Sequence, residues 1–287
     1  MTGELQRLVA EELARPVDPR VADLAAAIAA RHGAASRTVL FYGSCLREKQ
    51  LDGLMLDFYL IVSDYCAAYD KRWMARANAL IPPNVFPFQH DGLAAKYAVL
   101  SEPDFHRLNG PETRNVSVWA RFAQPSRLVW AAGDVARDAA ITAVARAAPT
   151  LLGAAGRVQG EAALDWWRRA FSLTYSAELR AERKGRSGSV IDANCKRYEL
   201  FSAPAAAAIE PGAASGGWAR RRIEGKALSV IRLAKASATY AGGADYIVWK
   251  INRHAGTDFA LKPWQRRHPL LGAISLLPRL LRSGAIR

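Results

Sequence analysis

The chain has 287 residues, of which 51% are hydrophobic and 23% are charged, a balance typical of an ordered globular protein and not of a disordered one. Its formal net charge of +14 favours an anionic partner, nucleic acid or an anionic membrane, although arginine-rich codon usage alone would give the same excess. No uncharged apolar run reaches about 18 residues, so the sequence predicts no membrane-spanning helix and only peripheral membrane contact.

Strands and helices are expected to alternate in the first half of the chain. The Asp18-Pro19 pair predicts the start of a helix that ends at Gly33. Apolar and β-branched runs predict strands over residues 38–42, 56–62, 96–100 and 116–122. Further helices are expected over residues 65–80 and, after a Ser101 cap, up to Leu108, with a loop over residues 81–92.

We expect mostly helices in the second half of the chain. Ala-rich segments over residues 133–152 and 161–170 predict helices, and residues 173–182 and 189–192 predict a hairpin. The predicted fold is therefore α+β, a nucleotidyltransferase-type mixed sheet flanked by helices, with an appended helical region. The predicted divisions are a core over residues 1–200 that includes a helical segment at 133–170, a linker over 201–218, and a basic helical region over 219–287.

A glycine-serine bend followed by a strand with an acid near its start is the segment most indicative of chemistry. Gly43 has no Cβ, so backbone N–H groups can approach phosphate oxygens there, and the Ser44 hydroxyl can donate to the same phosphate. Asp57 supplies a hard oxygen ligand of the kind that Mg²⁺ prefers. The pattern favours phosphate transfer, and its alternative is a turn glycine with a capping aspartate. Walker, G-x-G-x-x-G and H-E-x-x-H patterns are absent.

This segment resembles the DNA polymerase β-type nucleotidyltransferase superfamily, in which a Gly-Ser bend precedes Asp-x-Asp. Tyr59 stands here in place of the second acid. The run M-L-D-F at 55–58 further resembles the mitochondrial phosphatidate cytidylyltransferase family, which also lacks that acid. Shorter likenesses follow in the family's order across residues 38–200: Y-G-S at 42–44, V-S-D at 62–64, K-Y-A-V at 96–99, A-R-F at 120–122 and L-T-Y-S-A-E-L-R at 173–180.

The resemblance implies an activity and its acidic residues. It implies a Mg²⁺-dependent phosphatidate cytidylyltransferase, which forms CDP-diacylglycerol and pyrophosphate from CTP and phosphatidic acid. Asp57 would be catalytic and the main metal ligand. Glu178 would be a second catalytic metal ligand on a neighbouring strand, and its alternative is a surface ion pair with Arg180 or Arg183.

The resemblance also implies the phosphate-binding groups. Gly43 and Ser44 would hold the nucleotide phosphates, and Arg180 would join them. Lys96 and Arg121 fall in predicted strands, where positive charge is unusual, so they are expected on triphosphate or lipid phosphate; a solvated face is their alternative.

Two other functions compete with this one. The first is a nucleotidyltransferase that acts on RNA or a small molecule, in which the positive charge would serve to bind nucleic acid. The sequence contains no RRM, KH or zinc-knuckle pattern, so no nucleic acid is expected as a partner. A non-catalytic module that binds nucleotide or lipid is the other alternative. Asp52 is a weaker candidate metal ligand, Asp64 is expected in a turn, and His90 is expected in an exposed loop.

The C-terminal segment predicts contact with an anionic membrane surface. Its apolar residues share one helical face, its basic residues precede that face or lie away from it, and this pattern is typical of an interfacial helix. The membrane-binding candidates are Arg266, Arg267, Leu270, Ile274, Leu277, Arg279, Leu281 and Arg282. Pro278 should kink or end the helix, and an ordinary packing helix is the alternative.

The N-terminal residues and the cysteines indicate the cellular compartment in which the protein is expected. Glu4, Glu11 and Glu12 are atypical of a signal or transit peptide. The three cysteines lie far apart without metal-ligand spacing, which predicts reduced thiols. We therefore expect a cytoplasmic protein, peripheral on the inner face of the membrane.

Overall fold

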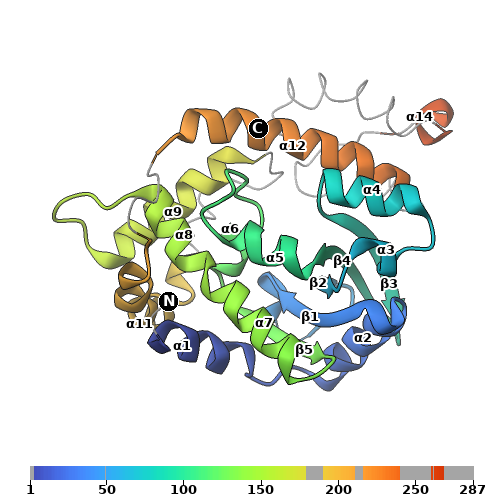
Figure 1. Ribbon diagram of the computed structural model, residues 1–287, viewed down its shortest axis with the longest axis horizontal. Helices are drawn as coiled ribbons and strands as arrows, with labels where there is room; N and C mark the ends of the chain where they lie inside the picture. The colour runs from blue at the N-terminus through green and yellow to red at the C-terminus, as the bar shows by residue number, and fades with distance from the viewer. Residues whose placement is uncertain are drawn as a thin grey trace.

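A mixed five-stranded sheet with helices on both faces forms the centre of the protein, as the α+β prediction requires (Figure 1). The computed structural model describes residues 3–48, 50–178, 190–210, 216–239, 260 and 262–267. The strands are β1 (Ser36–Tyr42), β2 (Met55–Val62), β3 (Asn84–His90), β4 (Leu93–Ser101) and β5 (Ser126–Ala131), in the spatial order β3-β4-β2-β1-β5. Strands β2 and β4 are parallel, and the other neighbouring pairs are antiparallel.

Alternation along the central strands divides the core into two layers. Phe41, Phe58 and Tyr97 face a cluster that includes α2 (Pro19–Ala30), α3 (Tyr65–Ala68) and α4 (Arg72–Leu80). Leu40 and Ile61 face the larger cluster on the other side. Its helices are α1 (Gly3–Leu13), α5 (Glu102–Asn109), α6 (Trp119–Phe122), α7 (Asp134–Ala145), α8 (Ala147–Ala155), α9 (Ala163–Ala177) and α11 (Cys195–Ala207).

Two predicted helix starts are confirmed by their caps. The Asp18 carboxylate accepts the backbone N–H of Arg20, and the Ser101 hydroxyl accepts that of Asp104. Both caps follow from local sequence, so they could be read without knowledge of the tertiary fold. The predicted helix over 65–80 is instead divided into α3 and α4.

Several predicted elements of the sheet are wrong. The predicted strand over 116–122 is the short helix α6, because its apolar residues fit a helical period as well as a strand period. The predicted loop over 81–92 contains β3, whose Pro87 is tolerated because β3 is an edge strand. Strand β5, with its half-buried side chains, was not predicted.

The predicted hairpin over 173–192 is also wrong. Residues 173–177 belong to α9, residues 190–192 are helical, and residues 179–189 lie outside the described part. Residues 201–207 of the predicted linker belong to α11. The division of the chain into domains otherwise stays a prediction.

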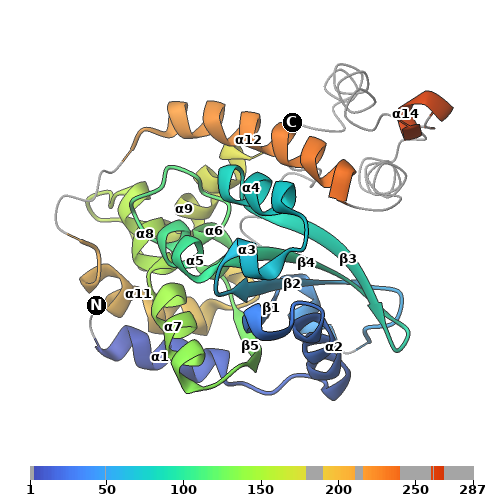
Figure 2. The same cartoon turned by 45° about the vertical axis from the view of Figure 1, so that its right-hand side comes forward.

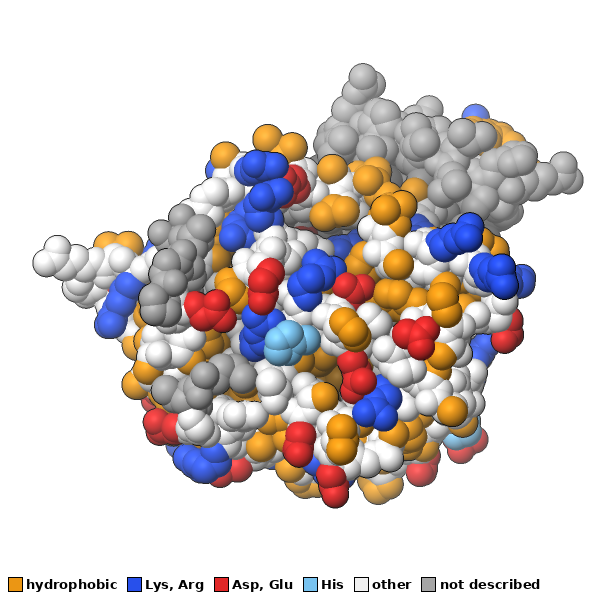
Figure 3. Space-filling view, in the orientation of Figure 1, with side chains coloured by type: hydrophobic (Ala, Val, Ile, Leu, Met, Phe, Trp, Pro, Cys, Tyr) orange, Lys and Arg blue, Asp and Glu red, His pale blue; other side chains and the backbone are white. Residues whose placement is uncertain are grey.

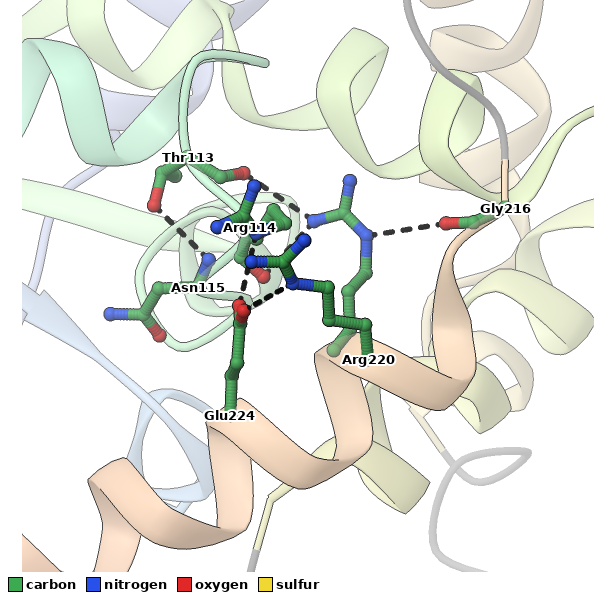
Figure 4. A network of polar contacts seen from close by, with 7 residues as sticks. Thr113, Arg114, Asn115, Gly216, Arg220 and Glu224 are labelled. Carbon is green, nitrogen blue, oxygen red and sulfur yellow. Dashed lines mark hydrogen bonds and ion pairs between the residues drawn. The ribbon is translucent and has the colours of Figure 1, made fainter.

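Helix α12 (Trp218–Thr239) lies over α9 at one end and extends towards α4 and the start of β3 at the other (Figures 1 and 2). Its first turns are held by polar contacts to the loop before α6 (Figure 4). Glu224 forms ion pairs with Arg114 at 3.0 Å and Arg220 at 2.6 Å, and Arg221 donates to the Arg114 carbonyl at 3.0 Å. These contacts set the position from which the rest of α12 reaches the edge strand β3.

The predicted membrane-binding segment falls mostly outside the described residues. Helix α14 (Pro263–Arg267) contains the backbone of Arg266 and Arg267, whose side chains are not among those described. Leu270, Ile274, Leu277, Arg279, Leu281 and Arg282 also lie outside the described part. Within the described residues, no helix combines the length and the apolar character that crossing a bilayer requires.

Candidate functional site

The glycine-serine bend and the predicted catalytic acid face each other across β1 and β2. Tyr42 ends β1 and pairs with Asp57 of β2, so Gly43 emerges directly beside the carboxylate. Gly43 has φ 96°, which favours glycine, and a Cβ added there would lie 3.5 Å from Asp57 Oδ2. Gly43 and Ser44 are exposed, so the bend is open to a ligand.

Lys96 reaches the same carboxylate from the neighbouring strand. The parallel register of β2 and β4 pairs Asp57 with Lys96, and Lys96 Nζ lies 2.9 Å from Asp57 Oδ1. The two side chains are 23% and 26% exposed, so solvent screens the pair only in part. No directed hydrogen bond reaches the buried Oδ1 from the described residues. The ion pair gives a physical reason for a lysine in this strand.

An aromatic layer surrounds Tyr59, the position at which the superfamily that the sequence resembles has a second acid. Tyr59 is 2% exposed, and its ring centroid lies 5.3 Å from that of Tyr42 and 5.2 Å from that of Phe122. An acid at position 59 would be buried among these rings. Burial, followed by the charge of Asp57, raises the pKa of Tyr42 well above its usual value, so Tyr42 stays protonated.

Arg121 and Glu178 form a second charged pair, on helices and not on the predicted strands. Arg121 lies in α6, donates to the Ser117 carbonyl, and its Nη1 lies 3.9 Å from Glu178 Oε1. Glu178 caps the C-terminus of α9 and is 8% exposed. Burial opposes the charge of Arg121, but the neighbouring Tyr59 and Glu178 outweigh it and raise its pKa, so Arg121 stays cationic.

The site fits Mg²⁺ only in part. Mg²⁺ in nucleotide sites commonly takes one or two carboxylates and completes its shell with phosphate oxygens and water, and Asp57 fits such a ligand. The described residues contain no group of three or more His, Cys, Asp or Glu suited to a metal. Glu178 lies 3.9 Å from Arg121 Nη1, and Asp57 lies 2.9 Å from Lys96 Nζ, so each carboxylate already has a cationic neighbour. The role of Glu178 as second metal ligand stays a prediction.

Sequence reasoning missed two cations that α12 brings to this face. Arg232 Nε donates to the Pro82 carbonyl at 2.8 Å and its Nη1 to the Ser117 hydroxyl at 2.9 Å, while Lys235 donates to the Ile81 carbonyl. Burial lowers the pKa of Arg232. Burial, followed by the charge of Arg232, lowers the pKa of Lys235 to about 7. Their i, i+3 spacing was the only signal, and it does not separate them from the other cations of this helix.

The remaining candidates lie apart from this arrangement. Asp52 is exposed and lies 3.3 Å from Arg20, and Asp64 accepts the N-terminal N–H groups of α3. His90 lies 3.5 Å from the exposed Asp91. Arg180 lies outside the described residues.

Two comparisons with known proteins add no relative. A scan against models of protein families finds no match to this chain, and a search of curated protein sequences finds none either.

Proposed function

We propose that this protein is a nucleotidyltransferase that makes CDP-diacylglycerol from CTP and phosphatidic acid. The observation that carries the proposal is the Gly43 bend facing Asp57, with Lys96 Nζ 2.9 Å from the carboxylate. A glycine bend open to phosphate, beside an acid and a cation on adjacent strands, suits the binding of a nucleoside triphosphate. The choice of CTP and phosphatidic acid comes from the sequence resemblance.

The proposed reaction is a displacement at the α-phosphorus of CTP. A phosphate oxygen of phosphatidic acid forms the new P–O bond, the bond between the α- and β-phosphates breaks, and pyrophosphate leaves with that electron pair. The main obstacle is repulsion between two anions. Lys96 and Arg121 would offset this charge, and the N–H groups at Gly43 and Ser44 would orient the phosphates. Asp57 would hold Mg²⁺, which neutralises phosphate charge when bound.

The surface charge supports an anionic membrane as the place of reaction. On the face seen in Figure 3, Lys and Arg side chains gather over the first turns of α12 and beside α4. Each cation near an anionic surface contributes about 1 kcal/mol to binding. We propose a peripheral protein on the cytoplasmic side of the inner membrane, with the segment after Pro263 as a further contact.

Product analysis separates this function from its competitors. The purified chain is incubated with Mg²⁺, one of the four nucleoside triphosphates at a time, and either phosphatidic acid micelles or RNA. We expect CDP-diacylglycerol with CTP and lipid only. Labelled RNA would instead support the RNA-modifying alternative, and absence of pyrophosphate under every condition would support a non-catalytic binding module.

A pair of isosteric variants tests Asp57 itself. Asp57→Asn removes the charge beside the bend, so turnover should fall at least about 100-fold while the protein stays folded. Asp138→Asn is the matched control, because Asp138 is exposed on α7 away from the sheet. The proposal fails if Asp57→Asn forms lipid product at the rate of the control.

A further inference from the structure

Two half-buried cations on α12 have no carboxylate partner among the described residues. Arg232 and Lys235 donate to a hydroxyl and to the carbonyls of Ile81 and Pro82. Within the described part of the chain, no carboxylate lies within ion-pair distance of either cation, and no acceptor binds Nη2 of Arg232. The buried Arg197, by contrast, pairs with Glu12 at 2.5 Å. Buried cations without a counter-charge are costly, so an anionic ligand would stabilise them.

Ser117 joins these cations to the proposed catalytic face. Its carbonyl accepts from Arg121 and its hydroxyl accepts from Arg232 Nη1 at 2.9 Å, so the two guanidinium groups share one buried residue. Of these two guanidinium groups, only that of Arg121 has a described carboxylate, Glu178, within ion-pair distance. The excess of positive charge matches a dianionic phosphate monoester better than a neutral ligand.

Two exposed apolar residues adjoin, in the sequence, Arg232 and the Ile81 acceptor of Lys235. Leu80 is 80% exposed directly before Ile81, and Ile231 is 43% exposed directly before Arg232. A free phosphate or a nucleotide makes no use of such neighbours, whereas the acyl chains of a lipid bury them. The combination therefore favours a phosphate group carried by a lipid.

We propose that Arg232 and Lys235 form a subsite for the phosphate monoester headgroup of the acceptor lipid, with Leu80 and Ile231 beside its acyl chains. This assignment rests on the proposed function for the identity of the lipid. The subsite would place the acceptor phosphate next to Arg121 and leave the Gly43 bend to the nucleotide.

Vesicle binding without CTP tests the subsite without any turnover. The full chain is titrated with phosphatidylcholine vesicles that contain either phosphatidic acid or phosphatidylglycerol at matched surface charge. Arg232→Gln/Lys235→Met should weaken binding to phosphatidic acid about 10-fold or more and leave binding to phosphatidylglycerol within about twofold. Arg222→Gln/Lys226→Met makes the same pair of substitutions at exposed positions of α12, so it should weaken both equally.

Kinetics distinguish the acceptor from the donor. We expect the double variant to raise KM for phosphatidic acid and to leave KM for CTP nearly unchanged. A rise in KM for CTP alone, or an equal loss for both lipids as in the control, would overturn the subsite. The single variant Lys235→Met repeats both measurements with the contacts of Arg232 intact. Selective vesicle binding without any lipid product would contradict the proposed function but would still support the subsite.

Discussion

Replacing Gly225 with alanine tests whether the seating of α12 on α9 places the cations of the lipid subsite. An added Cβ would lie inside the contact distance of the Ala177 carbonyl oxygen and 3.2 Å from its carbonyl carbon. Helix α12 would have to move outward by about 1 Å, and such overpacking costs about 1–3 kcal/mol. Alanine's higher helix propensity offsets at most about 1 kcal/mol, so we expect a net loss of about 1–2 kcal/mol.

Denaturant unfolding measures this loss, and vesicle binding shows whether selectivity for phosphatidic acid falls with it. Gly3→Ala is the matched control, because Gly3 begins α1 and an added Cβ meets nothing within 4 Å. The control should be as stable as the parent or slightly more stable. Equal stability of the two variants, with full lipid selectivity in Gly225→Ala, would refute the role given to the contact between α12 and α9.

Three further predictions concern stability, pH and the C-terminal segment. Arg197→Met leaves the 3% exposed Glu12 without its partner, so the free energy of unfolding should fall by about 3–5 kcal/mol in denaturant titration, whereas the exposed Arg168→Met should change it little. Vesicle affinity for phosphatidic acid should fall as the pH rises through about 7, because Lys235 loses its proton there, and Lys235→Arg should remove this loss. Deleting the residues after Pro263 should weaken sedimentation with anionic vesicles, and equal sedimentation at high salt would exclude an anchor there.

The bend and Asp57 could be predicted from the sequence because both depend on residues that lie close together in the chain. A β-branched run, Gly43 and a second apolar run describe two adjacent antiparallel strands, and their pairing necessarily brings Asp57 close to the bend. Lys96 was placed in a strand, but its contact with Asp57 follows from the parallel register of β2 and β4. That register is a long-range property that periodicity does not reveal.

The other half of the site depends on packing between distant segments. Alternating apolar residues before Arg121 predict a strand, yet the same residues fit the helical turn of α6. Glu178 was assigned to a hairpin, although it ends a long amphipathic helix. Arg232 and Lys235 have no distinctive local pattern, and only their contacts with Ile81, Pro82 and Ser117 distinguish them from the exposed cations of the same helix.

Because α12 follows the sheet by so many residues, the ribosome completes the two parts of the proposed site at different times. Asp57 precedes Arg232 by a stretch that translation at about 5–20 residues per second needs roughly 10–35 s to add. During that interval the nascent chain would contain the proposed nucleotide bend but not Arg232 and Lys235 of the proposed lipid subsite. Synthesis that stopped before Trp218 would therefore yield a product with the proposed nucleotide bend and without the proposed lipid subsite.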